Sequence, residues 1–322
     1  MIPASIPSPP IHGFPLGPFT IHIYALTMIL AMLAGGWITY VRYVRRGGSG
    51  DVALDAMFWA IPMGLVGARI YHVFTHPGDY FGEGKDPLAV FKVWEGGMAI
   101  FGAIGFGALG AVIALRIAKQ RIGPFADSVA PALLVAQAIG RLGNYFNQEL
   151  FGGSTELPWG LEIGDPYLQA FGIAPGTLVQ PLFLYEIVWN LAMALLLVFL
   201  DDHIRFKSGQ VMALYLVMYG TGRTILETWR LDTPDRILGL RVNMFTSLLV
   251  ILLGIIVFFV ARAVDAPTTV SPAEVEKYLE KREPQEDPKP GPNRAAIPAS
   301  QRARADNRAS EPQDMGEPDQ KR

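Results

Sequence analysis

Residues 128–153 read SVAPALLVAQAIGRLGNYFNQELFGG, and this stretch joins an apolar half to a polar half. The first half is apolar enough to lie in a membrane, although Pro131 interrupts it. The second half gathers an arginine, several side-chain amides, a tyrosine and a glutamate. Polar groups inside a membrane are costly and are usually functional. The stretch therefore predicts a membrane helix that ends in a polar site.

The composition of the whole chain favours a membrane protein. Of its 322 residues, 51% are hydrophobic and only 17% are charged, whereas a soluble protein carries about 25% charged residues. The net charge of -2, without an extended basic face, argues against a nucleic-acid partner. The absence of cysteine excludes disulfides, thiolate metal sites and a cysteine nucleophile within the chain.

The apolar residues occur in blocks long enough to cross a bilayer, which takes about 20 residues per helix. The hydropathy pattern predicts an all-α integral membrane protein with about seven transmembrane helices. These spans lie near residues 20–41, 53–75, 97–117, 126–143, 181–200, 209–226 and 243–262. The spans at 53–75 and 126–143 are the weakest because Pro62, Arg69 and Pro131 interrupt them.

Lysine and arginine in the links predict the orientation. The links after the first, third and fifth spans read RYVRRGG, RIAKQR and DDHIRFKSG, so their side is expected to be cytoplasmic. Residues 150–180 contain no lysine or arginine and are expected outside. The N-terminus is then outside and the C-terminus cytoplasmic. The outer link LDTPDRILGLR departs from this rule, and Arg230, Arg236 and Arg241 are interpreted as interfacial.

Two regions follow from this pattern. Residues 1–265 are predicted to form the seven-helix membrane domain, with 150–180 as its extracytoplasmic segment. Residues 266–322 mix charge and proline with few apolar residues. Such a segment buries too little apolar surface to offset its ordering entropy, so we expect a disordered cytoplasmic tail.

Arg141 begins the polar half of the opening stretch. If the helix continues, Asn144, Tyr145 and Gln148 share its face at spacings of three, four and seven residues. Gly152 and its neighbour would then end the helix.

A second polar group follows in the sixth span, which reads MYGTGRTILETWRLD. Arg223, Glu227 and Arg230 form one stripe, and Tyr219 lies one turn before Arg223. Because this span and the one ending at Arg141 both run outward, the two arginines are expected at the same depth.

These arginines allow two interpretations. A guanidinium near a helix end often reaches the interface without any function. Two guanidiniums that converge suit a phosphate, because their fork geometry matches its oxygens, and a phospholipid head group would then be the ligand. His22 and Tyr24 are expected at the same level, where a lone histidine is more often structural than catalytic.

The polar stretch resembles the signature of the prolipoprotein diacylglyceryl transferases, approximately G-R-[IL]-G-N-[FY]-x-N-x-E-x-x-G. The matching residues are Arg141, Gly143, Asn144, Asn147, Glu149 and Gly152. The segments IHIYAL, WEGGM, QPLFLYE and YGTGRTILE extend the resemblance over about residues 15–262.

The resemblance implies seven transmembrane helices, an outside N-terminus and a site that faces the extracytoplasmic leaflet of the bacterial inner membrane. It implies transfer of the sn-1,2-diacylglyceryl group of phosphatidylglycerol to the lipobox cysteine thiol of a prolipoprotein. A thioether forms and glycerol-1-phosphate leaves, with no cofactor or metal. The implied catalytic residues are Arg141, Arg223, His22, Tyr24 and Tyr219. Those implied to bind phosphatidylglycerol are Arg141, Asn144, Asn147, Glu149, Gly152, Arg223 and Glu227.

The chain departs from the family's pattern at one position. Many members carry HGG shortly after GGM, and that histidine has been proposed as the base, but Phe101 stands there in this chain. A free thiol has a pKa of about 8.5, and neighbouring guanidiniums favour its anion. The reaction is therefore expected to need no histidine at this position.

Two other functions remain compatible with a polar multi-helix membrane protein. One is a transporter or channel for an anionic lipid or solute, with the arginines as selectivity groups. Against it, the polar groups gather at the outer ends and line no continuous path. The other is a purely structural scaffold, which leaves the two arginine groups unexplained.

Overall fold

Seven long helices form the body of the described part of the protein. The computed structural model describes residues 5–16, 19–81, 84–93, 96–231, 236–237, 239–264 and 266–276. The long helices within these residues are α1 (Ile23–Arg45), α2 (Gly50–Thr75), α4 (Ile100–Ile117), α5 (Ile122–Phe146), α7 (Leu182–His203), α8 (Gln210–Glu227) and α9 (Val242–Val264). Each overlaps one of the predicted spans.

Six of these helices are long and apolar enough to cross a membrane, and α8 is the exception within the described residues. Large apolar side chains on the helix surfaces point away from the protein. Leu33, Phe58, Phe74, Leu195 and Phe259 are between 63% and 81% exposed. Water would disfavour so much exposed apolar surface, whereas lipid tails accommodate it. The chain is a multi-pass membrane protein.

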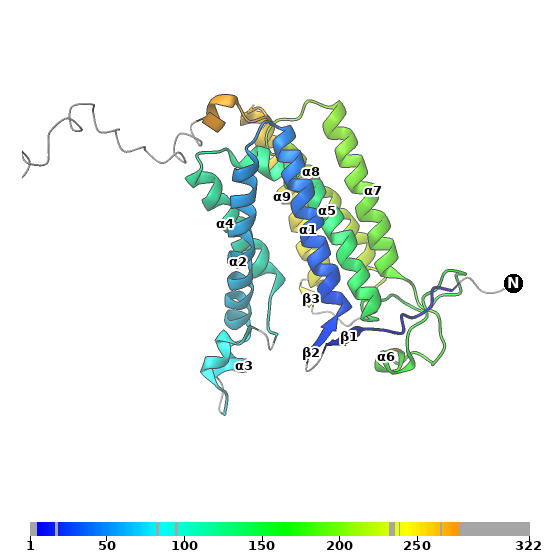
Figure 1. The fold of residues 1–322 in the computed structure, drawn as a ribbon. Coiled ribbons are helices and arrows are strands. Elements are labelled where there is room, and N and C mark those ends of the chain that lie inside the picture. Colours follow the sequence, from blue (N-terminus) through cyan, green and yellow to red (C-terminus); the bar gives the residue numbers. More distant parts are fainter. Residues whose placement is uncertain are drawn as a thin grey trace, which may run out of the picture. The chain divides into compact units, whose positions relative to one another are not determined.

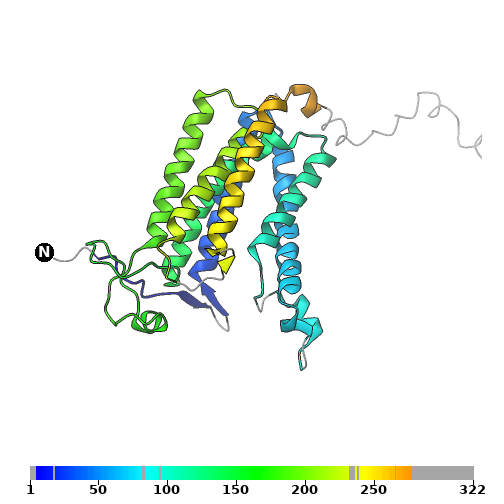
Figure 2. The same cartoon turned by 180° about the vertical axis from the view of Figure 1, so that it is seen from behind.

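Helix α5 lies among α1, α7 and α8, and α9 packs along α8. Helices α2 and α4 form a separate pair beside this group (Figure 1, Figure 2). Small residues allow these two helices to approach closely. A Cβ atom at Gly67 of α2 would lie 2.7 Å from the carbonyl oxygen of Gly102 of α4.

Arg69 interrupts the apolar surface of α2, and its charge is satisfied within the protein. Its guanidinium donates hydrogen bonds to the carbonyl oxygens of Val90 and Gly96, at 2.8 and 2.5 Å. It also lies 4.9 Å from the ring centroid of Tyr80. Arg69 therefore holds the link that joins α2 to α4, which includes α3 (Gly78–Phe81) and the short helix η1 (Pro87–Phe91).

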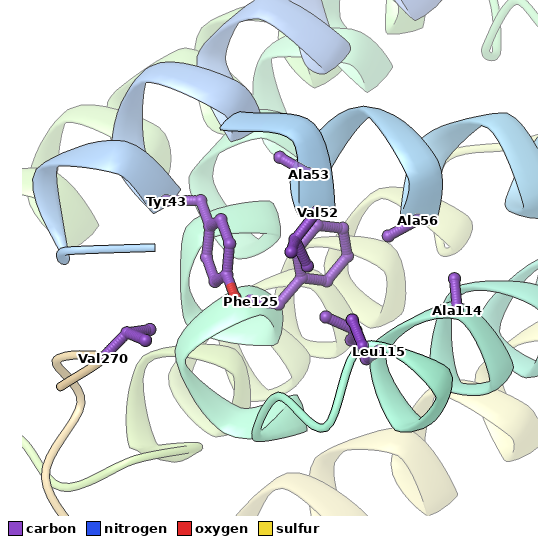
Figure 3. Close-up of a cluster of buried hydrophobic side chains, with 9 residues drawn as sticks. Tyr43, Val52, Ala53, Ala56, Ala114, Leu115, Phe125 and Val270 are labelled. Atoms are coloured by element: carbon purple, nitrogen blue, oxygen red, sulfur yellow. The ribbon is translucent and has the colours of Figure 1, made fainter. Parts of the chain in front are cut away.

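A buried apolar cluster joins the α2–α4 pair to the other helices (Figure 3). It draws on the end of α1, the start of α2, the end of α4, the start of α5 and one residue beyond α9. Its members are Tyr43, Val52, Ala53, Ala56, Ala114, Leu115, Ala118, Phe125 and Val270. Helix α4 contacts α5 only sparsely, so this cluster is the main apolar connection between the α2–α4 pair and α5.

Two small antiparallel hairpins depart from the expected all-α fold. Strands β1 (Gly13–Leu16) and β2 (Phe19–His22) pair before α1, and β3 (Arg236–Ile237) pairs with β4 (Leu240–Arg241) before α9. A third extended region lies within residues 150–180, which also contain α6 (Asp165–Ala170). There Leu161 pairs with both Ile6 and Val179. Backbone N–H and C=O groups in these links have no partners within a helix. They pair with the backbone of neighbouring segments instead, and this pairing gives extended structure.

The three basic links, which follow the first, third and fifth predicted spans, lie at one end of the helices, as the alternation of the spans predicted. Arg42 and Arg46 at the end of α1 both form ion pairs with Asp201 at the end of α7. Arg121, at the start of α5, contacts Glu274 beyond α9, at 2.8 Å. This end is called the basic end below.

The structure differs from the sequence-based expectation at residues 266–276, which were expected to be disordered. Val270 is 6% exposed, and its backbone N–H donates to the carbonyl oxygen of Arg46, at 2.7 Å. Arg121 lowers the pKa of the Glu274 carboxyl through their hydrogen bond. This contact therefore adds stability above the ordinary pKa of 4.5 and is lost as the pH falls through the lowered value. Residues 277–322 lie outside the described residues.

Replacement of the buried Val270 is expected to destabilise the protein. Val270→Ala removes two methyl groups from the apolar cluster, which should cost about 2 kcal/mol of unfolding free energy. Thermal unfolding in detergent measures the change. Val264→Ala is the matched control, because Val264 is 68% exposed. Equal melting temperatures for the two variants would show that the 266–276 segment is not anchored as described.

Candidate active site

Glu186 connects the two arginines that the sequence placed at one depth. Its Oε2, near the start of α7, forms an ion pair with Arg141 Nε of α5. Its Oε1 lies 3.6 Å from Arg223 Nη1 of α8. The side chains of Glu186, Arg141 and Arg223 are 10%, 22% and 16% exposed. Arg141 and Arg223 therefore converge, and a carboxylate from a third helix lies between them.

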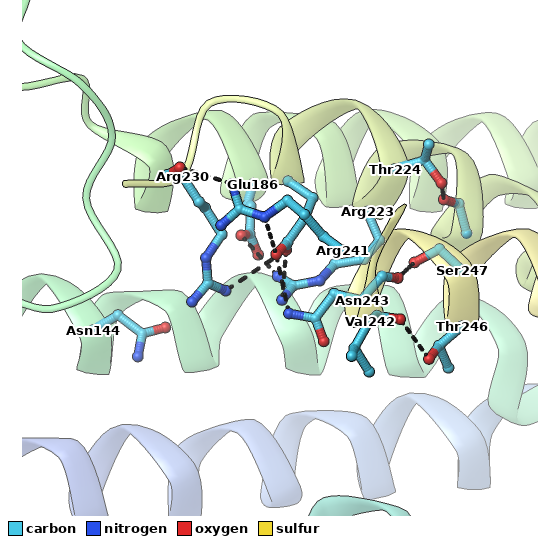
Figure 4. A network of polar contacts seen from close by, with 12 residues as sticks. Asn144, Glu186, Arg223, Thr224, Arg230, Arg241, Val242, Asn243, Thr246 and Ser247 are labelled. Carbon is cyan, nitrogen blue, oxygen red and sulfur yellow. Dashed lines mark hydrogen bonds and ion pairs between the residues drawn. The ribbon is translucent and has the colours of Figure 1, made fainter. Parts of the chain in front are cut away.

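Glu227 is a fully buried carboxylate in the last turn of α8. Its Oε2 lies 3.1 Å from Arg223 Nη2 and 3.9 Å from Arg230 Nη1. Its Oε1 lies 3.3 Å from Arg241 Nε and accepts a 3.1 Å hydrogen bond from Asn243 Nδ2. Figure 4 shows Arg223, Arg230, Arg241 and Asn243 turned toward one another. The arginine–glutamate cluster is defined as Arg141, Glu186, Arg223, Glu227, Arg230 and Arg241.

The interfacial interpretation of Arg230 and Arg241 is wrong. Their side chains are 10% and 16% exposed and turn inward toward Glu227. A buried carboxylate needs paired charges and hydrogen bonds, and these two arginines supply part of that pairing. The spacing of three residues between Glu227 and Arg230 could have indicated the first contact. No local pattern indicates the second. The side chain of Arg236 lies outside the described parts of the chain.

The signature segment extends the cluster toward the surface. Arg141 Nη1 donates a 2.9 Å hydrogen bond to Asn144 Oδ1. Asn144 Nδ2 donates to Glu149 Oε1 at 2.7 Å, and Asn147 Nδ2 reaches the same oxygen at 3.5 Å. Asn144 is buried and Glu149 is exposed. Four residues proposed from the sequence thus form one continuous hydrogen-bonded chain.

The helix ends earlier than the sequence indicated, because α5 stops at Phe146. Gln148 then has a φ of 53°, in the left-handed region, so it does not share the face of Arg141. Its Oε1 instead accepts a 2.7 Å hydrogen bond from the backbone N–H of Gly164. The Tyr145 hydroxyl donates to the carbonyl of Pro7, at 2.8 Å. The side chains of Tyr145 and Gln148 therefore hydrogen-bond to the segments around Pro7 and Gly164 and not to Arg141.

Gly152 lies where three segments meet. Its N–H donates to the carbonyl of Gln180 at 2.9 Å, and it forms an antiparallel bridge with Arg230. A Cβ atom here would lie 2.9 Å from the carbonyl oxygen of Trp229. This close approach requires glycine and fixes the backbone that carries Arg230. The side chains of Gln180 and Leu182 also lie close to Gly152.

The other three residues proposed as catalytic occupy different surroundings. The Tyr24 ring packs on Gly143, where a Cβ atom would lie 2.6 Å from Tyr24 Cδ2. His22 precedes α1 as its N-cap residue, and its exposed side chain forms no hydrogen bond with the described residues. Tyr219 stacks on Tyr215 with a centroid separation of 5.9 Å. Tyr24 therefore lies beside the signature segment, whereas neither of the other two has a polar contact with the cluster in the described structure.

Arg141 and Arg223 bring two guanidiniums together at the site. The carboxylates of Glu186 and Glu227 that contact them are both buried. Each guanidinium has five N–H donors, and the ion pairs described above use only some of them. Donors held in a partly buried site bind a phosphate strongly and stabilise negative charge that develops on it. The arrangement therefore suits a phosphate-bearing ligand.

Comparison with known proteins agrees with this geometry. The family model described as prolipoprotein diacylglyceryl transferase matches residues 12–260. The chain belongs to this family. Members called phosphatidylglycerol--prolipoprotein diacylglyceryl transferase are similar to it in several bacteria. The protein of Paenarthrobacter aurescens is 46% identical over 278 residues, covering 84% of this chain and 86% of that protein.

Two further relatives carry the same name. The protein of Bifidobacterium longum subsp. infantis is 46% identical, over 80% of this chain and 85% of its own length. The protein of Rhodococcus jostii is 43% identical, over 84% of this chain and 79% of its own length. Phe101, which the sequence resemblance places where many family members carry a histidine, is 52% exposed at the start of α4, and its ring centroid lies 6.3 Å from that of Tyr71.

The distance between α7 and α8 is expected to depend on Gly222. A Cβ atom there would lie 2.5 Å from Trp189 Cδ1, one turn from Glu186. Gly222→Ala should therefore push α7 away from Arg223 and cost about 1–3 kcal/mol through overpacking. Gly105→Ala on α4 is the matched control, because no atom lies within 4 Å of its Cβ position. Equal melting temperatures for Gly222→Ala and Gly105→Ala would contradict this packing.

Proposed function

We propose that this chain transfers the sn-1,2-diacylglyceryl group of phosphatidylglycerol to the lipobox cysteine thiol of prolipoproteins, the first step of lipoprotein maturation. Its family and the names of its relatives support the reaction. The structural observation that carries the proposal is the convergence of Arg141 and Arg223 on Glu186. This convergence provides a partly buried, positively charged site for a lipid phosphate.

The site faces the extracytoplasmic leaflet of the bacterial inner membrane. The basic end lies away from the cluster, and basic links favour the cytoplasmic side. The N-terminus is then outside, and the seven long helices all cross the membrane. Helix α8 can cross because Arg223 and Glu227 turn toward other protein groups and not toward lipid.

Arg141 and Arg223 bind the phosphate of phosphatidylglycerol, while the acyl chains remain in the surrounding lipid. Asn144, Asn147 and Glu149 orient the glycerol head group, since they extend from Arg141 toward the surface. Glu227 holds Arg223 in position. The remaining substrate-binding residue, Gly152, keeps the backbone close to this site.

The prolipoprotein supplies the nucleophile. Its thiolate attacks the glyceryl carbon bonded to the phosphate oxygen, so a C–S bond forms as the C–O bond breaks. The bonding electrons pass to the phosphate oxygen, and glycerol-1-phosphate leaves as a dianion. The thiol proton goes to solvent. The arginines favour this step twice, because they lower the pKa of the incoming thiol and stabilise the charge that develops on the phosphate.

Tyr24 and Tyr219 shape the site beside the signature segment and Arg223. His22 assists modestly, if its side chain turns toward the thiol. Deprotonation relies mainly on the positive field of the arginines, since Phe101 takes the place of the family histidine.

The transfer assay uses purified protein, phosphatidylglycerol and a peptide with a lipobox cysteine. Arg141→Lys and Arg223→Lys should each reduce the transfer rate by about 10²-fold or more, because lysine keeps the charge but loses the bidentate fork. Arg116→Lys, an exposed arginine at the basic end, is the control and should retain full activity. Wild-type rates for both lysine variants of the cluster would refute the phosphate assignment.

The pH–rate profile tests the role of His22. If the arginine field dominates, His22→Gln should keep at least about a tenth of the activity, and the rate should rise along one limb set by the thiol. A general base typically contributes 10²–10⁴-fold. A loss of about 10²-fold, together with disappearance of a limb of the pH–rate profile, would instead identify His22 as the base.

A further inference from the structure

A polar pocket lies at the basic end, with a volume of about 540 Å³. Its walls come from the end of α1, the link between α7 and α8, and the start of the 266–276 segment. Tyr24 at the start of α1 packs near the cluster, whereas this pocket is at the other end of the same helix. Twenty-three helical residues separate those ends by about 34 Å. The pocket is therefore distinct from the candidate active site.

The floor of the pocket is a preorganised set of ion pairs. Asp201 Oδ2 accepts hydrogen bonds from both Arg42 and Arg46. Arg46 also donates to the Thr268 hydroxyl, which in turn donates to Asp127 Oδ2 at 3.0 Å. Two carboxylates thus balance the two floor arginines, and the hydroxyl of the 266–276 segment holds Arg46 in place. These contacts fix the floor before any ligand binds.

The rim carries an excess of positive charge. Arg45 and Arg205 line it together with one carboxylate, that of Asp202. Arg45 and Arg205 are exposed, so their guanidiniums are open to the surroundings. A cavity lined by surplus cations attracts an anion with several oxygens.

We propose that this pocket binds a phosphate group at the membrane face opposite the transferase site. A phosphate group matches the guanidinium fork, and the volume lies within the usual range for small ligands. The group can be the head of an anionic phospholipid or free inorganic phosphate, because the recognising chemistry is the same.

Site-specific protection of arginine tests the proposal on the full chain in nanodiscs. Phenylglyoxal modifies exposed arginines, and peptide mass spectrometry gives the rate at each position. Bound phosphate should slow modification of Arg45 and Arg205, by about tenfold at a ligand concentration about ten times Kd. Arg116 and Arg262, exposed near the same end, are the internal controls and should react at unchanged rates.

Two arms distinguish the sources of the phosphate. The first uses phosphatidylcholine nanodiscs with added inorganic phosphate, and the second uses nanodiscs that contain phosphatidic acid in a phosphate-free buffer. Protection in the first arm identifies free phosphate as a sufficient ligand. Protection in the second arm alone identifies a lipid head group. Absence of protection in both, or equal slowing at Arg116 and Arg262, overturns the proposal.

A pair of double variants provides an independent measurement. Arg45→Gln with Arg205→Gln removes two rim charges, whereas Arg116→Gln with Arg262→Gln removes two charges outside the pocket. Native mass spectrometry counts the phosphatidic acid molecules retained by each protein, and inorganic phosphate is titrated in parallel by 31P NMR. The rim variant should bind the ligand identified above about tenfold more weakly, which corresponds to a loss of about 1.4 kcal/mol. Equal binding by the two double variants overturns the proposal.

Discussion

The shared carboxylate of Glu186 is the contact on which the rest of the site depends. It lies between Arg141 and Arg223, and so connects α5, α7 and α8 at one level. Removal of one partner from a buried ion pair leaves an uncompensated charge and typically costs about 3–5 kcal/mol. Within the site, each guanidinium contacts a carboxylate that at least one other guanidinium also contacts. This mutual dependence keeps the donors rigid for a phosphate.

Both ends of the helices combine apolar packing with charged contacts. At the basic end, apolar packing around Tyr43 and Phe125 joins the α2–α4 pair to α1 and α5. At the other end, charged contacts around Glu227 connect α8 and α9, and the α2–α4 pair takes no part in them. Buried charges add little net stability compared with apolar packing. The apolar clusters, one of which includes Phe151, Leu168 and Phe183 at the site end, therefore supply most of the stability that holds the charged contacts in place.

Much of the fold could be predicted because a membrane helix is specified locally. Backbone groups in lipid must pair within the segment, so about 20 apolar residues suffice to indicate a span. The observed bounds of α1, α5 and α9 differ from the predicted spans only at their ends. The order of residues 266–276 was missed because composition alone does not show that Val270 fills a gap between distant helices.

The sequence by itself determined the helices, the family resemblance and the depth at which Arg141 and Arg223 lie, since hydropathy and helical spacing are local properties. Only the tertiary structure decided which carboxylate each arginine meets. Glu186 comes from a third helix, and Arg241 reaches Glu227 from the far side of a hairpin. Such contacts depend on how helices pack side by side. An unpaired charge is costly inside a membrane. The packing of the helices therefore places Arg230 and Arg241, which were interpreted as interfacial from the sequence, in one buried network with Glu227.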